Sequence, residues 1–450
     1  MSAGVAMTSR QVRAAKTFLE HLAGQLNAPI SVRLWDGTTI ALSNNVRPEL
    51  VLSISGPGVI GSLLRRPTPD NLLRHYARKQ IDFHGADLYT FLDAARVRHS
   101  RQKSRRIPKT VLARSVASFL FTPSESTDVD HRYAGDELGH RRRQGENKDF
   151  IQFHYDISNE FYALFLDPEM VYSCAYFTDW NNSLEQAQQD KLDMICRKLR
   201  LQPGERFLDI GCGWGALVCH AARHYGVQAH GITLSERQLA SARKKVARLG
   251  LQKQVTLELR DYQHLEGQWD KIASIGMVEH VGIANMQAYM HKVRELLPDR
   301  GMFLNHGLTR PAKANRRKFR RMRPERRLLA KYIFPGGELD HIGHMLETME
   351  AAGLEVHDVE GWRDHYALTC KLWCQRLSDQ QDEAIRHVGE ERYRMWILYL
   401  AGVSMAIRDG SACIFQTVSS NRASKGISGM PPTRSHLYLA ASSVLRREAA

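Results

Sequence analysis

The sequence predicts an α/β protein in which a doubly wound parallel sheet follows a smaller N-terminal α+β domain. Short apolar segments alternate with helix-like segments between residues 206 and 306, and this alternation is typical of a parallel sheet covered by helices on both faces. Residues 1–97 mix helical and strand-like patterns without that regularity. At 450 residues the chain also exceeds the length of one ordinary domain.

The smaller domain is predicted over residues 1–97. Apolar residues recur at helical spacing over 9–26 and again over 86–97, which predicts two helices. Residues 31–42 predict a hairpin that turns at Asp36 and Gly37, and residues 49–54 predict a further strand. This domain carries no recognisable chemistry in its sequence.

The larger domain is predicted over residues 151–420. Its strands are short and apolar, and we place them at 206–210, 227–233, 255–259, 271–277 and 301–306. The segments 216–225, 236–249 and 284–297 between them have helical spacing. Residues 98–150, which begin with a basic run without acids, predict a solvated linker, and residues 421–450 predict a loosely ordered tail.

Composition and charge indicate a globular protein with an anionic partner. Hydrophobic residues make up 43% and charged residues 25% of the chain, which excludes a fibrous or wholly disordered protein. The 63 basic and 48 acidic residues give a net charge of +15, so nucleic acid or an acidic lipid surface is expected as partner. Without a long apolar run or an apolar N-terminal segment, we expect neither a membrane span nor a secretory signal. The seven cysteines show no metal-binding spacing and favour a reduced, cytosolic compartment.

A glycine-rich loop at the end of the first predicted strand of the larger domain is the strongest motif. Residues 207–215 read Phe-Leu-Asp-Ile-Gly-Cys-Gly-Trp-Gly, so a strand enters a tight turn before a helix, where the backbone can approach a ligand closely. Dinucleotide-binding proteins share such loops. Here, however, Asp209 stands two residues before the first glycine, where its carboxylate can accept hydrogen bonds from an ammonium group and would sit poorly beside a pyrophosphate. The loop therefore predicts S-adenosylmethionine as the cofactor, held by Asp209, Gly211, Cys212, Gly213, Trp214 and Gly215.

The ends of the next two strands extend this predicted cofactor site. Dinucleotide folds usually place an acid after the second strand for the ribose hydroxyls, and here Thr233 and Gln238 offer neutral hydrogen-bonding groups instead. Glu236 fits equally well as a residue of the first helical turn. Asp261 and Tyr262 follow the third strand, where they can hold the adenine. The predicted contacts of these two turns are Thr233, Leu234, Ser235, Gln238, Asp261 and Tyr262.

Short motifs in a fixed order carry a family resemblance over residues 150–420. They are 154–156, 172–177, 187–188, the glycine-rich loop, 231–235 with Gln238, 276–282, His306, 332–337 and 365–366. In this order they resemble the cyclopropane-fatty-acyl-phospholipid synthase family, which includes the mycolic acid cyclopropane synthases and related lipid methyltransferases. The resemblance implies a Rossmann-like, S-adenosylmethionine-dependent methyltransferase domain, in which Tyr172 and Ser173 also contact the cofactor.

The resemblance also implies a reaction and its site. In that family the alkene of an unsaturated phospholipid acyl chain attacks the methyl carbon of the sulfonium, and bound bicarbonate removes a proton so that a cyclopropane ring closes. The bicarbonate is held by a Cys, a Glu, a His, a Tyr and a backbone amide, which match Cys174, Glu279, His306, Tyr366 and Leu308 here.

These residue types suit that chemistry. A carbocation needs a water-free pocket, and the aromatic faces of Tyr176, Phe177 and Tyr366 can stabilise its charge. His306 and Tyr366 can donate hydrogen bonds to bicarbonate, and an ionised Glu279 can either accept from the bicarbonate hydroxyl or orient His306.

The sequence departs from the family pattern in two places. Gly307 and Leu308 follow His306 where the family tends to have Thr-Ile, so the pocket shape is expected to differ. Residues 310–331 are strongly basic and fall where family members have material near the acyl entrance. This segment is either a solvated helix or a contact with anionic phospholipid headgroups, and we expect peripheral association with the inner face of the membrane. By resemblance, residues 1–97 are expected to help in lipid engagement or in forming a homodimer.

Alternative functions stay open at this point. Methyl- or methylene-branched products would need the same fold and cofactor. The charge also fits a nucleic-acid methyltransferase or binding protein, but no RNA-binding motif is present, so no nucleic-acid partner is expected. A catalytically inactive lipid-binding homologue is disfavoured by the intact cofactor loop. His220 and His224 lie four residues apart without a convincing third ligand, so we predict no metal site.

Overall fold

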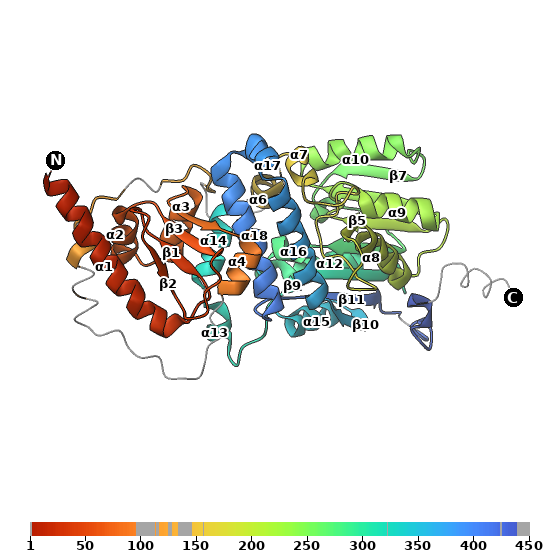
Figure 1. Ribbon diagram of the computed structural model, residues 1–450. Coiled ribbons are helices and arrows are strands. Elements are labelled where there is room, and N and C mark those ends of the chain that lie inside the picture. Colours follow the sequence, from red (N-terminus) through yellow and green to blue (C-terminus); the bar gives the residue numbers. More distant parts are fainter. Residues whose placement is uncertain are drawn as a thin grey trace. The chain divides into compact units, whose positions relative to one another are not determined.

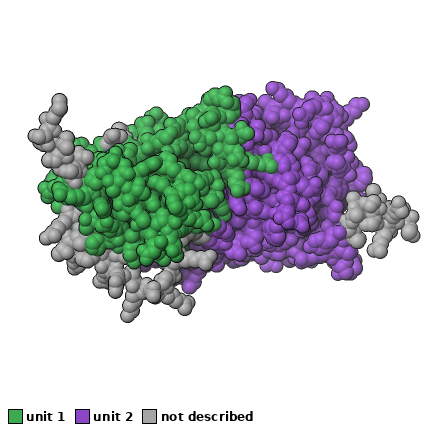
Figure 2. Space-filling view, in the orientation of Figure 1, with its two compact units in different colours: residues 1–134, 322–333, 374–402 green, residues 135–321, 334–373, 403–450 purple. Residues whose placement is uncertain are grey.

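The computed structural model describes residues 2–95, 113, 117–124, 128–133, 146–155, 157–321, 323–423 and 425–438. The chain divides into two compact units, which Figure 2 colours separately. Unit 1 comprises residues 1–134, 322–333 and 374–402, and unit 2 comprises residues 135–321, 334–373 and 403–450. Most of the predicted linker 98–150, and residues 439–450 of the predicted tail, lie outside the described residues.

Unit 1 contains a four-stranded sheet in the order β2-β1-β3-β4. The predicted hairpin is present, because β1 (Ser31–Arg33) pairs antiparallel with β2 (Thr39–Ala41). On its other side β1 pairs parallel with β3 (Val51–Ile54), which pairs antiparallel with β4 (Ile81–His84). Unit 1 includes the helices α1 (Ser2–Leu26), α2 (Pro57–Arg65), α3 (Pro69–Ala77), α4 (Leu88–Ala95), α14 (Pro324–Tyr332) and α17 (Gln381–Val388).

Polar contacts hold two segments from the C-terminal half of the chain, residues 322–333 and 374–402, in unit 1. The side chain of Arg394 donates to the carbonyl oxygens of Tyr76 and Ile81, at 2.7 and 3.0 Å, and pairs with Asp82 at 2.9 Å. The Tyr332 hydroxyl donates to Asp70 at 2.7 Å. Two of the boundaries between the units fall inside helices, one in α16 (Arg363–Asp379) and one in α18 (Glu390–Arg408).

Unit 2 contains the predicted doubly wound sheet, which has seven strands in the order β10-β11-β9-β8-β5-β6-β7. Its strands β5, β7, β9, β10 and β11 are labelled in Figure 1. The five predicted strands are β5 (Arg206–Ile210), β6 (Gln228–Thr233), β7 (Val255–Leu259), β8 (Lys271–Ile275) and β9 (Met302–Thr309). They are parallel to one another. Two strands that were not predicted, β10 (Leu354–Gly361) and β11 (Cys413–Asn421), extend this sheet, and β11 pairs antiparallel with both neighbours.

Helices cover both faces of this sheet, as the doubly wound fold requires. Phe207 and Ala273 pack with α8 (Leu184–Leu199), α9 (Ala216–Tyr225) and α10 (Glu236–Arg248). Leu208 and Ile272 point the opposite way, toward α11 (Val278–Val281), α12 (Met286–Glu295) and α15 (Ile342–Ala351). This alternation follows from the two-residue period of a strand. The remaining helical elements of unit 2 are α6 (Glu146–Tyr155), α7 (Asn159–Ala163), α13 (Arg316–Arg320) and the short 3-10 turns η1 (Tyr262–His264), η2 (Ile283–Asn285) and η3 (Ser435–Leu437).

Among the described residues, no helix combines the length and the apolar character that crossing a bilayer requires.

Candidate active site

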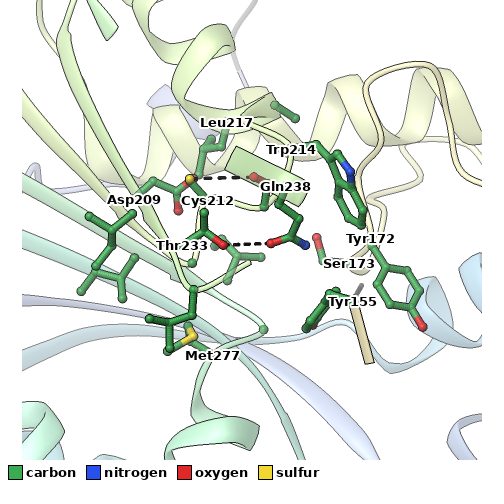
Figure 3. Close-up of a pocket in the computed structure, with 18 of the residues that line it drawn as sticks. Tyr155, Tyr172, Ser173, Asp209, Cys212, Trp214, Leu217, Thr233, Gln238 and Met277 are labelled. Atoms are coloured by element: carbon green, nitrogen blue, oxygen red, sulfur yellow. Dashed lines mark hydrogen bonds between the residues drawn. The ribbon is translucent and has the colours of Figure 1, made fainter. Parts of the chain in front are cut away.

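A cavity lies where the strands β5, β6 and β8 end, which is where open α/β sheets bind their ligands. Its empty volume, which includes space open to solvent, is about 930 Å³. Figure 3 shows Asp209 and Cys212 on one side of the cavity and Tyr172 and Ser173 on the other. The predicted cofactor residues in its lining are Tyr172, Ser173, Asp209, Gly211, Cys212, Gly213, Trp214, Thr233, Leu234, Gln238, Asp261 and Tyr262.

The two other predicted cofactor residues, Gly215 and Ser235, shape the cavity from outside its lining. Gly215 is the N-cap of α9 at a φ of +82°, and a Cβ there would lie 3.1 Å from that of Ala242 on α10. Ser235 caps α10, since its hydroxyl accepts a hydrogen bond from the Gln238 backbone at 3.2 Å. Both residues therefore fix helices that carry lining residues.

The glycine-rich loop approaches the cavity closely because Gly211 lacks a side chain. Gly211 has a φ of +85°, and a Cβ at this position would lie 2.9 Å from Cγ of Met277. The N–H groups of Gly211 and Cys212 both donate to the carbonyl oxygen of Ile232 on β6, at 3.0 and 2.9 Å. Those two donors are thus used within the fold.

Asp209 presents a buried carboxylate to this cavity. Burial raises its pKa to about 7, although the positive charge of Lys191 acts in the opposite direction. Its Oδ1 atom has no hydrogen-bond partner within the described part of the chain. A buried carboxylate oxygen without a donor is costly, so the ammonium group of S-adenosylmethionine fits here as the missing donor.

Neutral polar side chains complete the cofactor cavity. The Thr233 hydroxyl donates to Oε1 of Gln238 at 2.9 Å, a bond drawn in Figure 3. This leaves the Gln238 amide nitrogen as a donor on the cavity side. The indole N–H of Trp214 donates to Asn159 at 2.8 Å, which fixes the ring.

The five predicted catalytic residues form one cluster beside the cavity and are not part of its lining. Cys174, Leu308 and Tyr366 pack together with the buried Trp362. The ring of His306 stands edge-on to Trp362, with ring centroids 5.2 Å apart. Glu279 joins the cluster through Leu308, whose backbone N–H donates to Oε1 of Glu279 at 2.5 Å. The Leu308 amide predicted to face bicarbonate is therefore bonded to Glu279 in this structure.

Lys191 connects the cluster with the cofactor cavity. It lies on α8, lines the cavity and donates to the Ser173 hydroxyl at 2.9 Å. Its charge also acts on Cys174 and His306. Burial lowers the pKa of Lys191 to about 8, so this cation is held in an environment that opposes its charge.

Glu279 and His306 each carry a buried polar atom without a partner. Glu279 lies in the first turn of α11, which follows β8, and its Oε2 atom has no hydrogen bond to any described residue. His306 is fully buried on β9, and its Nε2 atom is likewise unpartnered within the described ranges. These two atoms fit bicarbonate, which can accept a hydrogen bond from an imidazole N–H and donate one to a carboxylate.

The partner that orients His306 is Gln416. Its amide nitrogen lies 2.9 Å from Nδ1 of His306, whereas Glu279 is bonded to Leu308. Of the two roles left open for Glu279, that of orienting His306 therefore belongs to Gln416. Burial and two nearby lysines lower the pKa of His306, so the ring is neutral near pH 7.

The remaining predicted side chains differ in their surroundings. Cys174 is fully buried, with its thiol directed at the carbonyl oxygen of Ala175 at 3.2 Å, and burial raises its pKa, which keeps it protonated. Tyr366 is half-buried on α16, with its ring centroid 6.2 Å from that of Trp373. Tyr176 packs on Trp362 in the cluster at 4.8 Å, whereas Phe177 stacks against His365 at 6.2 Å.

Several residues of this site were not predicted from the sequence. Tyr155, Met277 and His280 line the cavity, Gln416 contacts His306, and Lys198 donates to Gln416. The sequence did contain one sign that Lys191 and Lys198 are buried, because both lie on the apolar face of α8 with Ile195 and Leu199. A lysine on an apolar helix face must find a buried partner.

Within the described residues, no group of three histidine, cysteine, aspartate or glutamate side chains could hold a metal ion. His220 instead faces the carboxylate of Asp193, with Nε2 and Oδ1 4.0 Å apart.

Comparison with known proteins identifies the family. Residues 142–417 match the family model described as mycolic acid cyclopropane synthetase. The chain belongs to this family. Mycolic acid cyclopropane synthase CmaA1, complexed with SAH and CTAB, superimposes on the chain with a TM-score of 0.57 at 34% identity, over 61% of this chain and 98% of CmaA1. The protein is thus a member of the cyclopropane synthetase family and an S-adenosylmethionine-dependent methyltransferase.

Relatives within and beyond the mycolic acid enzymes are similar to this chain. A probable fatty acid methyltransferase of Pseudomonas putida is 35% identical over 421 residues, which cover 92% of this chain and 97% of the relative. Cyclopropane mycolic acid synthase 3 of Mycobacterium tuberculosis is 36% identical over 265 residues, covering 58% of this chain and 92% of that enzyme. Homology therefore supports a lipid as the methyl acceptor.

The buried carboxyl of Glu279 predicts a pH dependence of stability. Burial raises its pKa from 4.5 to about 7, so between these values the folded chain keeps a proton that the unfolded chain has lost. The free energy of unfolding then falls as the pH rises through this window, by about 1.4 kcal/mol per unit of pKa shift, or on the order of 3 kcal/mol. Glu279→Gln removes this contribution. In urea denaturation, the free energy of unfolding of the variant relative to that of the wild type should therefore increase by that amount from pH 4.5 to 7. A difference that stays constant with pH would contradict the burial of this carboxyl.

Proposed function

We propose that this methyltransferase adds a methylene group from S-adenosylmethionine across the double bond of an unsaturated phospholipid acyl chain, which closes a cyclopropane ring. The observation that carries the proposal is the pair of unpartnered buried atoms, Glu279 Oε2 and His306 Nε2, in a cluster beside the cofactor cavity. An acid and an imidazole in a dry cluster suit a small bound base better than they suit a large substrate. The names of the relatives support lipid chemistry of this kind.

Each residue of the cluster has a defined task in this proposal. When bound, S-adenosylmethionine supplies an electrophilic methyl carbon, and bicarbonate supplies the base that takes the final proton. His306 and Tyr366 donate hydrogen bonds to that base, and ionised Glu279 accepts one. Trp362 and Cys174 exclude water, because both are almost fully buried, and the face of Tyr176 stabilises positive charge on the acyl chain.

The nearest alternative gives a methyl- or methylene-branched chain through loss of a different proton. It is favoured by one observation, since the relative that covers 92% of this chain is named a probable fatty acid methyltransferase. The fold, the cofactor and the residues of the cluster are compatible with both the cyclopropane product and the branched product.

Lipid analysis after expression in a host with unsaturated phospholipids distinguishes the two products. Acyl chains should gain the mass of one methylene group and should resist mild catalytic hydrogenation, as a ring does. Uptake of hydrogen by the new product would support the branched alternative instead. Unchanged acyl chains would contradict both.

We further propose that α13 docks on anionic lipid. The described side chains of Arg317, Lys318 and Arg320 are exposed on this helix. Two other cations of the basic segment are occupied: the Arg310 guanidinium lies 3.7 Å from the ring centroid of Phe319, and Lys331 pairs with Asp70 at 3.3 Å. A basic residue near an anionic surface contributes about 1 kcal/mol, so this helix can support peripheral binding.

Reversing the charges on α13 should weaken vesicle binding. The triple variant Arg317→Glu, Lys318→Glu and Arg320→Glu should lose on the order of a hundredfold in affinity for phosphatidylglycerol vesicles, measured by sedimentation. Wild-type binding should itself fall as salt is added. The matched control reverses Lys244, Arg248 and Lys253, which are exposed on and after α10. An equal loss in both triple variants would show that net charge alone drives binding.

A further inference from the structure

A row of polar side chains crosses three neighbouring strands of the sheet in unit 2. Glu360 on β10 is paired in register with Gln416 on β11, and Gln416 is paired with His306 on β9. Directly paired residues bring their side chains close together on one face. The side chain of Lys198 reaches this row from the last turn of α8 and is 1% exposed.

The lysine determines which way the Gln416 amide points. The Lys198 ammonium pairs with the Glu360 carboxylate and donates to Oε1 of Gln416 at 2.8 Å. An ammonium group can only donate, so Gln416 must turn its oxygen to Lys198. Its NH₂ group consequently faces Nδ1 of His306, at 2.9 Å.

The orientation of the amide in turn determines the proton position on His306. Because the Gln416 nitrogen donates, Nδ1 must accept, and in a neutral imidazole the proton then sits on Nε2. Nε2 is the buried ring atom for which the described chain provides no partner. Trp362 limits rotation of the ring, since it lies edge-on to His306 at 5.2 Å and beneath the Lys198 ammonium at 5.2 Å.

We propose that Lys198 and Gln416 are positioning residues that hold His306 in its Nε2–H tautomer, so that the imidazole presents a hydrogen-bond donor to the anion bound in the cluster. The identity of that anion as bicarbonate rests on the proposed function, whereas the tautomer does not. In the opposite tautomer two N–H groups would face each other in a buried site. Leaving a buried donor unsatisfied disfavours that form by about tenfold or more.

Nitrogen NMR of the full-length protein labelled with ¹⁵N-histidine tests this relay without any substrate. The His306 signals are assigned by their absence in His306→Gln. In the wild type, free of S-adenosylmethionine, lipid and bicarbonate, Nε2 should be protonated and Nδ1 unprotonated, with the other tautomer populated at about one tenth or less. A protonated Nδ1 in the wild type would overturn the proposal.

Two variants test the two links of the relay. Gln416→Glu places an acceptor opposite Nδ1, so Nδ1 should gain a proton, and turnover should fall at least tenfold with unchanged affinity for S-adenosylmethionine. The double variant Lys198→Met and Glu360→Gln frees the amide while keeping the local charge balanced, and both tautomers should then appear. The matched control Ser419→Ala, which removes a buried hydroxyl of the same strand that bonds to none of the described residues, should leave the His306 signals unchanged.

The outcomes separate the relay from the proposed function. Unchanged His306 signals in both Gln416→Glu and the double variant would refute the relay, whatever the enzyme makes. If one variant does not fold, the other still gives a decisive result, because the tautomer depends on both links and breaking either one should change the His306 signals. The predicted signals together with a lack of any lipid product would support the relay and reject the proposed function.

Discussion

Glu279→Gln should lower the turnover number by about a hundredfold to ten-thousandfold, the usual contribution of a positioned acid–base group. The amide keeps the shape of the side chain but cannot provide the negative charge that binds the hydroxyl of bicarbonate. The Kd for S-adenosylmethionine should stay unchanged, since Glu279 is outside the lining of the cofactor cavity. Transfer of label from S-adenosylmethionine to unsaturated phospholipid vesicles measures turnover, and calorimetry measures the Kd.

One control variant and one further test variant accompany this experiment. Glu295→Gln changes an exposed carboxylate on α12 that pairs with Lys292 at 2.9 Å, and it should leave both quantities unchanged. Tyr366→Phe removes one hydroxyl from the cluster and should lower turnover without affecting the Kd. Wild-type turnover in both Glu279→Gln and Tyr366→Phe would remove these residues from the reaction.

Gly211→Ala should raise the Kd for S-adenosylmethionine by about tenfold or more, because it changes both the backbone and the cavity. A Cβ at this position would lie 2.9 Å from Met277, a lining residue, and the φ of +85° disfavours any side chain by roughly 1–2 kcal/mol. The displaced loop also carries Asp209 and Cys212 away from the cofactor. Calorimetric titration with S-adenosylmethionine measures the change.

Gly204→Ala separates these two effects. Gly204 has nearly the same φ, +83°, but no described atom lies within 4 Å of the position of its Cβ. This variant should lose a similar amount of stability while keeping the wild-type Kd. Equal Kd values in the two variants would show that crowding at Gly211 has no role in cofactor binding.

The parts of the fold that could be predicted from the sequence are those in which the buried residues are also the apolar ones. The strands β5 to β9 are apolar and end at turns with glycine or polar residues, so both their type and their order could be predicted. By contrast, β11 contains Gln416, Thr417 and Ser419, which are all buried. From sequence alone, polar residues of this kind are predicted to be exposed, because their hydrogen-bond partners on other strands are not known. The edge strand β10 is mostly half-exposed and lacks an apolar pattern.

The same limit applies to the site. Cofactor residues adjacent to the glycine-rich loop follow from one local motif, and the catalytic residues follow only from the order of many motifs along the chain. Gln416 and Lys198 could not be assigned, because their roles depend on the register between β9 and β11 and on a contact 218 residues apart in sequence. The same reason applies to the placement of residues 374–402 in unit 1, because Arg394 donates hydrogen bonds to residues that lie more than 300 positions earlier in the sequence.

Product formation by the purified protein in buffer depleted of bicarbonate tests the central claim most directly. With S-adenosylmethionine and vesicles of unsaturated phospholipid, we expect little product until bicarbonate is added, then a rise in turnover that saturates and yields acyl chains resistant to hydrogenation. Glu279→Gln should show no such rise. Full activity in the depleted buffer, unaffected by added bicarbonate, would contradict a bound base between Glu279 and His306.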